Sequence, residues 1–180
     1  MIDPKDREEL LRVARRSVEE TLRGGDYRPD VPPDGPLAEK RGAFVTLTRA
    51  GKLRGCIGLV VSDRPLIRVV AEMATAAARD DYRFSPVRRE EFPELRIEIS
   101  ALTPLEPVAG PEEIRVGRDG LLIRKGASSG LLLPQVADRE GWDAERFLDE
   151  TCRKAGLPAG AWREGASVER FGAEVWGEEE

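Results

Sequence analysis

Residues 53–58, with the sequence LRGCIG, place an arginine and a cysteine two positions apart. The apolar run continues to Val61 and predicts a strand, in which side chains alternate between two faces. Arg54, Cys56 and Gly58 are therefore expected on one face, and these residues on the other: Leu53, Gly55, Ile57, Leu59 and Val61. Two positions along a strand span about 6–7 Å, a separation at which a guanidinium group favours a thiolate. This spacing makes Cys56 the candidate nucleophile.

The two glycines beside Cys56 admit two interpretations. Glycine weakens the interior of a strand, so the pair Gly55 and Gly58 indicates that something approaches the backbone closely. One interpretation is a ligand, because backbone N–H groups here would receive a developing oxyanion, a carboxylate or a phosphate. The other is a β-bulge or a tight contact within the sheet, beside an ordinary buried thiol.

The chain contains no histidine. This excludes Ser-His-Asp and Cys-His catalysis, histidine-ligated zinc and the facial triad of non-haem iron. A general base for Cys56 must then be a carboxylate, and Glu98 is the candidate because it falls on the polar phase of strand 95–102. A glutamate buried near a cleft titrates above its free value. The alternative for Glu98 is a salt bridge with Arg54 or Arg83.

Four further side chains are candidates for binding a substrate. Arg54 and Arg83 would hold a small anion, since guanidinium groups stay charged and grip carboxylate or phosphate with paired hydrogen bonds. Alternatively, internal carboxylates neutralise both arginines: Glu98 and Asp80 or Asp81. Ser100 lies beside Glu98 on the same strand face. Gln135 offers donors and an acceptor to a planar group, or else makes a hydrogen bond at a helix N-terminus.

Neither a metal nor a cofactor is predicted, although a Mg²⁺ or Ca²⁺ site made of carboxylates alone stays open. Cys56 and Cys152 are the only thiols, too few for a four-cysteine zinc site or an iron–sulfur cluster, and no acidic loop has EF-hand spacing. Cys152 falls on the apolar stripe of a helix capped by Asp143, so packing explains it. The charged start of the chain does not resemble a signal peptide, which predicts a cytoplasmic protein with reduced thiols; a bridge between the two cysteines stays open.

Charge and hydropathy limit the partners. The chain has 29 Lys and Arg against 34 Asp and Glu, a net charge of -5. A dedicated nucleic-acid binder usually shows a basic excess, so this balance argues against one. Arg83, Arg88 and Arg89 are interleaved with Glu90, Glu91 and Glu94, a pattern that indicates a solvated surface. No apolar stretch is long enough to span a bilayer, so no membrane role is expected.

The elements that position these residues are helices inserted among mostly antiparallel strands, which predicts an α+β fold. A helix is expected from Asp3-Pro4 to Gly24, with an apolar face made of Leu11, Ala14, Val18 and Leu22. A loop rich in proline and glycine follows over residues 25–42. The other expected elements are helices after Pro65 and Asp143, a helical turn at 111–114, and strands 43–49, 53–61, 95–102, 120–124, 130–133 and 168–176.

Strands 43–49 and 53–61 are joined by a short turn and predict a hairpin. Together with strand 95–102 they are expected in one sheet, because each carries polar residues on one phase. That arrangement would bring Arg54 and Cys56 to a common polar face with Glu98.

Five blocks of the sequence resemble the AMMECR family, known in prokaryotes as AmmeMemoRadiSam system protein A. They are LRGCIG at 53–58, DYRFSP at 81–86, EIS at 98–100, GLLLPQVA at 130–137 with Gly141-Trp142, and CRKAGL at 152–157 with Trp162. The resemblance implies one AMMECR-type domain over residues 1–180, with a larger sheet-and-helix lobe and a smaller one to which 111–140 contributes. It also implies that the signature at 53–58 lies near the cleft between them.

The resemblance implies association with a Memo-type protein and a radical-SAM protein, and it carries no established activity. Two functions therefore stay open. In the first, the protein is an enzyme or thiol carrier: Cys56 forms a covalent adduct with a small anionic substrate, which Arg54 and Arg83 bind, while Glu98 handles protons. In the second, the cleft binds a ligand or a partner without chemistry, and Cys56 is only packed.

Overall fold

The computed structural model describes residues 1–178 and divides into two compact units. The first comprises Met1–Leu102 and the segment that begins at Glu174, and the second comprises Thr103–Ala173. Each unit contains an antiparallel four-stranded sheet and helices, so the predicted α+β class is confirmed.

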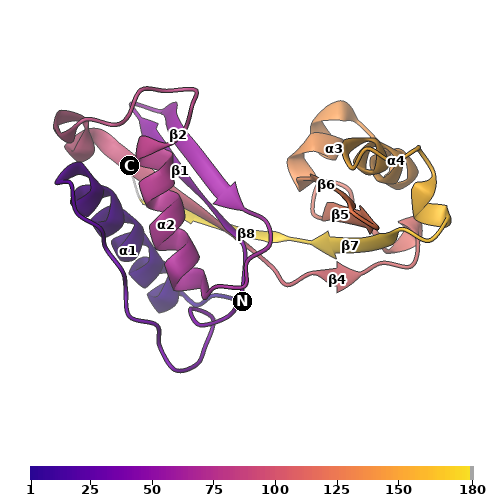
Figure 1. The fold of residues 1–180 in the computed structure, drawn as a ribbon, viewed down its shortest axis with the longest axis horizontal. Coiled ribbons are helices and arrows are strands. Elements are labelled where there is room, and N and C mark those ends of the chain that lie inside the picture. Colours follow the sequence, from indigo (N-terminus) through magenta and orange to yellow (C-terminus); the bar gives the residue numbers. More distant parts are fainter. Residues whose placement is uncertain (179–180) are drawn as a thin grey trace. The chain divides into compact units, whose positions relative to one another are not determined.

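In the first unit, two helices cover one face of the sheet (Figure 1). The strand order is β2-β1-β3-β8, and both neighbours of β1 run antiparallel to it. The elements are α1 (Pro4–Leu22), β1 (Ala43–Arg49), β2 (Lys52–Leu59), α2 (Leu66–Arg79), the 3-10 helix η1 (Arg89–Glu94), β3 (Leu95–Leu102) and β8 (Ala173–Gly177). The expectation that strands 43–49, 53–61 and 95–102 share one sheet is confirmed.

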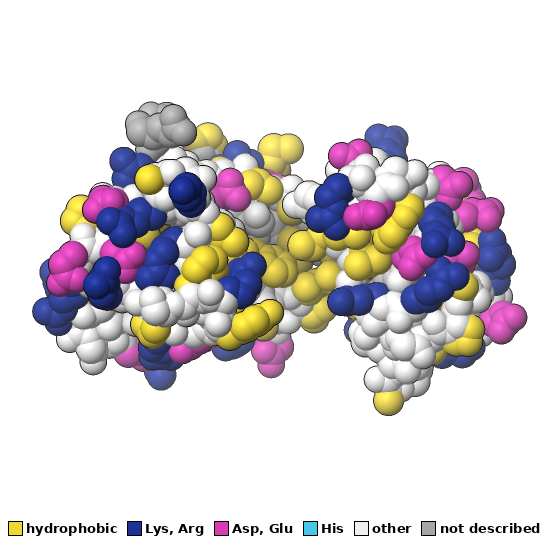
Figure 2. Space-filling model, turned by 90° about the horizontal axis from the view of Figure 1, so that it is seen from above, with side chains coloured by type: hydrophobic (Ala, Val, Ile, Leu, Met, Phe, Trp, Pro, Cys, Tyr) yellow, Lys and Arg dark blue, Asp and Glu magenta, His cyan; other side chains and the backbone are white. Residues whose placement is uncertain are grey.

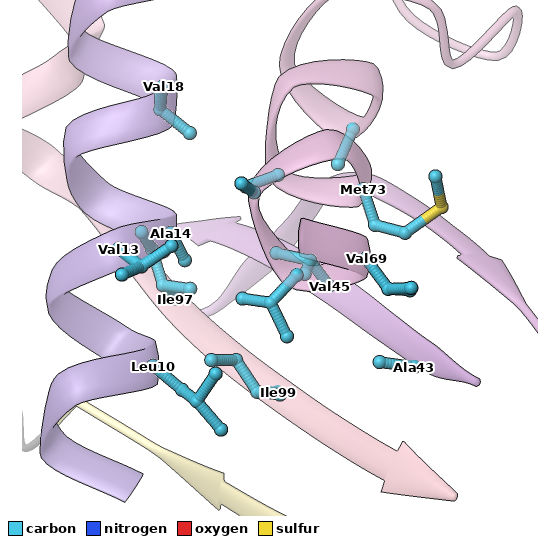
Figure 3. Packing of buried hydrophobic residues seen from close by; sticks show 14 of the residues in the cluster. Leu10, Val13, Ala14, Val18, Ala43, Val45, Val69, Met73, Ile97 and Ile99 are labelled. Atoms are coloured by element: carbon cyan, nitrogen blue, oxygen red, sulfur yellow. The ribbon is translucent and has the colours of Figure 1, made fainter. Parts of the chain in front are cut away.

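The core of this unit lies between the sheet and the two helices (Figure 3). Alternate residues of β1 and β3 are fully buried and contribute one wall: Ala43, Val45, Leu47, Leu95, Ile97, Ile99 and Ala101. Helix α2 contributes a buried stripe that includes Leu66, Val69, Val70, Met73, Ala74 and Ala77. Asp3 caps α1 as expected, since its carboxylate accepts the Asp6 N–H at 2.8 Å.

The apolar face of α1 differs from the prediction by one position. Its buried residues are Leu10, Val13, Ala14, Ser17 and Val18, whereas the predicted Leu11 and Leu22 are only partly buried. Ser17 occupies a core position because its hydroxyl donates to the Val13 carbonyl at 2.8 Å, which satisfies the buried oxygen within the helix.

The second unit has its own sheet, of order β4-β7-β5-β6, and its own core. Its elements are β4 (Glu106–Pro107), η2 (Pro111–Glu113), β5 (Gly120–Lys125), β6 (Ser128–Leu132), α3 (Pro134–Glu140), α4 (Ala144–Lys154), η3 (Ala161–Arg163) and β7 (Ser167–Phe171). Asp143 caps α4 as predicted, accepting the Arg146 N–H at 2.8 Å. Cys152 of α4 is a free, fully buried thiol, and burial raises its pKa.

The predicted strand 168–176 is wrong as a single element. The chain forms β7 and β8 instead, which belong to different sheets and different units. The break falls at Gly172, whose N–H donates to Thr103 Oγ1 at 2.7 Å and whose carbonyl accepts the Thr103 N–H at 2.9 Å. These bonds to Thr103 replace ladder bonds at that position, so the sheet does not continue through it.

Residues 25–42 lack helix and strand apart from a single bridge between Lys40 and Pro65. Within residues 1–178, no helix is both long enough and apolar enough to cross a membrane. On the face that Figure 2 shows, cationic and anionic side chains are interspersed, with no field of a single sign.

Candidate functional site

Cys56 lies at one end of a row of three side chains that crosses the sheet on the face away from the helices. Thr46 of β1 stands opposite Cys56 of β2 on one side and opposite Glu98 of β3 on the other. Cys56 and Glu98 therefore share a face, with β1 between their strands. Two interstrand spacings amount to about 9–10 Å between their backbones, too far for direct proton transfer.

A β-bulge decides which face Cys56 occupies. At the turn, Thr48 stands opposite Leu53, but the next pair is Leu47 with Gly55, so Arg54 is the extra residue. Without this insertion Cys56 would stand opposite Val45, on the buried face.

The bulge also corrects two predicted positions. Leu53 shares the face of Thr48 and is 43% exposed, so it does not join Gly55 and Ile57. Arg54 leaves the Cys56 face and its side chain reaches the outer edge of β2, where its partners lie.

The Cys56 thiol is free and half-buried, and it has one defined polar neighbour. The Thr46 hydroxyl donates to Cys56 Sγ at 3.2 Å. Thr46 was absent from the sequence-based candidates, although strand alternation places it on the polar phase of β1. Its pairing with Cys56 could not be foreseen, because that pairing depends on the strand register and therefore on the bulge.

Asp81 and Arg83 hold the backbone of Cys56 from the outer edge of the sheet. The Cys56 N–H donates to Asp81 Oδ2 at 2.8 Å, and Arg83 Nη2 donates to the Cys56 carbonyl at 3.3 Å. The two side chains also pair with each other, Arg83 Nη2 to Asp81 Oδ2 at 2.7 Å and Nε to Oδ1 at 2.9 Å.

The Asp81 side chain is only 2% exposed. The hydrogen bonds from Arg83 hold the pKa of Asp81 well below its usual range, against the opposing effect of burial. Asp81 is thus a charged anchor for β2, and the pairing foreseen as the alternative for Arg83 is the one the structure contains.

Arg54 is held by Glu91, a residue that sequence reasoning assigned to a solvated surface. Arg54 Nε and Nη2 donate to the two carboxylate oxygens at 2.8 and 3.0 Å, and Nη1 donates to the Ser85 carbonyl at 3.0 Å. The Glu91 side chain is 7% exposed. Hydrogen bonding from Arg54 lowers the pKa of Glu91 to about 2, with burial acting in the opposite direction.

Two more arginines complete the environment of Glu91. Arg49 Nη1 donates to it at 3.3 Å, and the Arg88 N–H donates at 2.8 Å. The signal in the sequence was faint: Glu91 stands three residues after Arg88 at the start of η1, the spacing at which a glutamate accepts the N-cap amide.

The protein itself fills the space beside the two glycines. A Cβ on Gly55 would lie 2.1 Å from the Ala77 carbonyl oxygen of α2, and one on Gly58 would lie 2.2 Å from Cδ1 of Phe44. The close approach inferred from the sequence is real, and it supports the tight-contact interpretation of these positions.

The remaining candidates lie apart from Cys56. Glu98 is exposed and lines a depression of about 570 Å³ near the β1–β2 turn, with Thr48 and Arg96. Within residues 1–178 its carboxylate has no hydrogen-bond partner, because Arg54 and Arg83 are paired elsewhere. Ser100 stands opposite Phe44, one row from Cys56. Gln135 is exposed on α3, in the second unit.

No group of three or more Asp, Glu and Cys side chains within residues 1–178 is arranged to hold a metal ion. The groups that the site itself presents are a thiol, a neighbouring hydroxyl and a more distant carboxylate.

Residues 11–176 match the family described as AMMECR1. The chain belongs to the AMMECR1 family. A relative from Thermococcus kodakarensis is 51% identical over 184 residues, covering 94% of this chain and 89% of its own. A relative from Pyrococcus furiosus is 49% identical over 184 residues, with 94% and 87% covered.

The AMMECR1 fold is also present in a solved structure. The crystal structure of the uncharacterized protein PH0010 from Pyrococcus horikoshii has a TM-score of 0.76 and 47% identity, covering 96% of this chain and 91% of that one. The family assignment that the five sequence blocks implied is confirmed.

Proposed function

We propose that this AMMECR1 protein is an enzyme or thiol carrier in which Cys56 forms a covalent bond to a small substrate on the open face of the first sheet. The observation that supports this most is the hydrogen bond from the Thr46 hydroxyl to the half-buried Cys56 Sγ at 3.2 Å. A donor aimed at sulfur is placed where negative charge develops when the thiol is deprotonated.

The rigid backbone around Cys56 also fits a nucleophile. Asp81 and Arg83 engage its N–H and carbonyl, so the sulfur is presented from a strand that is fixed on its outer edge as well as by β1. A reacting group that is held in place loses less entropy when it meets a substrate.

Glu98 is the proposed acceptor of the proton that Cys56 loses. The S–H bond of Cys56 breaks, the proton passes along bridging water to the exposed Glu98 carboxylate, and the sulfur lone pair attacks an electrophilic carbon of the substrate. The same proton then returns to the group that leaves. Because Thr46 stands between Cys56 and Glu98, the water would run past its hydroxyl across the two interstrand spacings.

The proposed substrate is small and anionic, and Arg83 is the group that would meet it. The Arg83 side chain is 43% exposed, against 14% for Arg54, which is enclosed by Glu91 and two backbone carbonyls. An anion at Arg83 would share the guanidinium group with Asp81.

Selective alkylation tests the proposal. At pH 7, iodoacetamide is expected to alkylate the Cys56 thiol at least roughly ten times faster than it alkylates the thiol of free glutathione. It should leave the native Cys152 unmodified, because that thiol is fully buried. Peptide mass spectrometry measures both sites at once, and a C56S variant provides the blank. If Cys56 is alkylated no faster than free glutathione, Cys56 is not an activated nucleophile and the proposal is wrong.

A second function is favoured by the neutralised arginines and the filled glycine positions, which leave no open anion pocket at residues 54–58. In that function the first unit binds a partner, and the resemblance implies a Memo-type or a radical-SAM protein. Calorimetric titration with each purified protein from the same organism tests it. Equal binding by the wild-type chain and C56A, with no alkylation selectivity, would favour this function over the thiol chemistry.

A further inference from the structure

A second hollow of the first unit lies on its helical side, away from the sheet face that carries Cys56. It is a cavity of about 370 Å³ between residues 26–29, at the start of the proline-rich loop, and the outward side of α2. That volume lies within the range of sites that take small molecules. It is unrelated to the thiol chemistry proposed above.

The charges that line this cavity cancel in pairs, with one exception. Arg28 Nε lies 3.0 Å from Asp26, and Arg79 Nε donates to Asp80 at 2.8 Å. Glu72 is paired with Arg64, which lies outside the cavity.

The exception is Arg68, which lines the cavity from α2 and is half-buried. Within residues 1–178 its guanidinium group has neither an ion-pair partner nor a hydrogen-bond acceptor. Glu72, one helical turn later and its natural partner, is engaged by Arg64 instead. The cavity lining thus includes one guanidinium group that no carboxylate of the described residues pairs with.

An aromatic wall lies on the loop side of the cavity. Tyr27 is half-buried, packs against the core and lines the cavity. The Arg16 guanidinium group lies 4.4 Å from its ring centroid, which holds the ring from outside the cavity lining. Small apolar surfaces complement it: Pro29, Ala71 and Ala76.

We propose that this cavity binds a small aromatic carboxylate, with Arg68 holding the carboxylate and the Tyr27 side of the cavity holding the ring. A guanidinium group grips a carboxylate with two parallel hydrogen bonds. A flat ring suits a site whose apolar surface is an aromatic side chain and short aliphatic ones. A ligand without the carboxylate would lose the interaction with Arg68, and a ligand without the ring would lose the contact with Tyr27.

Amide chemical shifts of the full-length protein, titrated with benzoate as the probe, test the proposal. The expected response is confined to residues 26–29 and 68–80. Benzamide, which has the same ring without the charge, and acetate, which has the charge without the ring, should each bind at least roughly tenfold more weakly.

Two variants separate a specific site from general attraction of anions. R68Q is expected to weaken benzoate binding by roughly tenfold or more, whereas R79Q, which removes another cation of the lining that is paired with Asp80, should stay within about twofold. Both should keep the wild-type amide spectrum outside the cavity, which shows that they fold. Equal loss in the two variants, an unchanged affinity in R68Q, or shifts located elsewhere would overturn the proposal.

Discussion

At the scale of single residues, two buried carboxylates organise the candidate site. Asp81 and Glu91 each accept hydrogen bonds from an arginine and from a backbone amide, so both charges are fully engaged. Burying an ion is costly unless its partners satisfy it, and removing one partner leaves the other charge exposed to that cost. The primary role of Arg54 and Arg83 is therefore structural: they hold β2 in place through Glu91 and Asp81.

Glu91 should make the first unit sensitive to acid. Its folded-state pKa is about 2, below the ordinary 4.5. The carboxylate therefore contributes stability above pH 4.5, and this contribution is lost as the pH falls from 4.5 toward 2. E91Q is expected to cost about 3 kcal/mol at pH 7 and to flatten that part of the pH profile. Urea unfolding followed by amide signals of the first unit measures both.

E94Q is the matched control, since Glu94 also pairs with Arg49 but its side chain is 56% exposed. It should cost less than about 1 kcal/mol. Equal losses in E91Q and E94Q would contradict the assignment of Glu91 as the buried hub.

Thr46 should control the reactivity of Cys56 through its hydroxyl. T46V keeps the shape of the side chain but removes the donor, so alkylation of Cys56 at pH 7 is expected to slow by roughly tenfold. T46S restores a hydroxyl and should recover most of the rate. Measuring the rate of iodoacetamide labelling in the three proteins checks this, and equal rates in T46V and T46S would assign Thr46 to packing alone.

At the scale of elements, the orientation of Cys56 on the β1–β2 hairpin depends on an irregularity. The bulge at Arg54 turns Cys56 to the open face, and α2 presses against the other face at Gly55. Strand alternation alone correctly assigned Glu98 to the polar side of β3. It assigned Leu53 and Arg54 wrongly, because one inserted residue reverses the phase of everything before it.

Gly55 and Gly58 should respond differently to alanine. The G55A methyl group would meet the backbone of Ala77, which cannot move without displacing α2, so a loss of about 3 kcal/mol is expected. The G58A methyl group would meet mainly the Phe44 ring, with Cδ1 at 2.2 Å and Cγ at 2.3 Å, and also the Ala43 carbonyl oxygen at 2.7 Å. Because F44A removes both ring atoms but not the carbonyl, thermal or urea unfolding of the double variant G58A/F44A should show partial recovery relative to G58A.

The same Phe44 substitution serves as the control for Gly55. F44A is not expected to rescue G55A, because the two clashes lie on opposite faces of the sheet. Rescue of both glycine variants by F44A would show that the α2 contact is not what requires Gly55.

At the scale of the whole molecule, the chain divides its hydrophobic residues between two cores. The second unit is one continuous stretch, Thr103–Ala173, while the first is completed by β8 from the C-terminal end. A continuous segment with its own four-stranded sheet and buried residues such as Phe147 has what an independently folding domain needs.

The fragment of residues 103–173 is therefore expected to fold alone. Its core holds Trp142 against Phe147, with ring centroids 6.5 Å apart, so tryptophan fluorescence reports on it. A cooperative urea transition and dispersed amide shifts are the expected results. A fragment spanning 1–102 lacks β8 and should unfold more readily than the intact chain. Loss of structure in 103–173 alone would show that the units depend on each other.

The sequence by itself determined the family, the α+β class, the helix caps at Asp3 and Asp143, and the strands with clear alternation. These are local properties, because a helix cap or a periodic pattern of apolar residues involves only residues that are close together in the sequence. Cys56 as the candidate thiol also followed from the sequence. So did Glu98 on its polar strand phase.

Only the tertiary structure decided the partners. The burial of Glu91, the split at Gly172 and the donor from Thr46 each join residues that are distant along the chain or depend on strand register. A charged side chain looks the same in a sequence whether it is solvated or buried against an arginine. The pairing of Arg54 with Glu91 requires β2 and η1 to be brought together, and no local pattern encodes that approach.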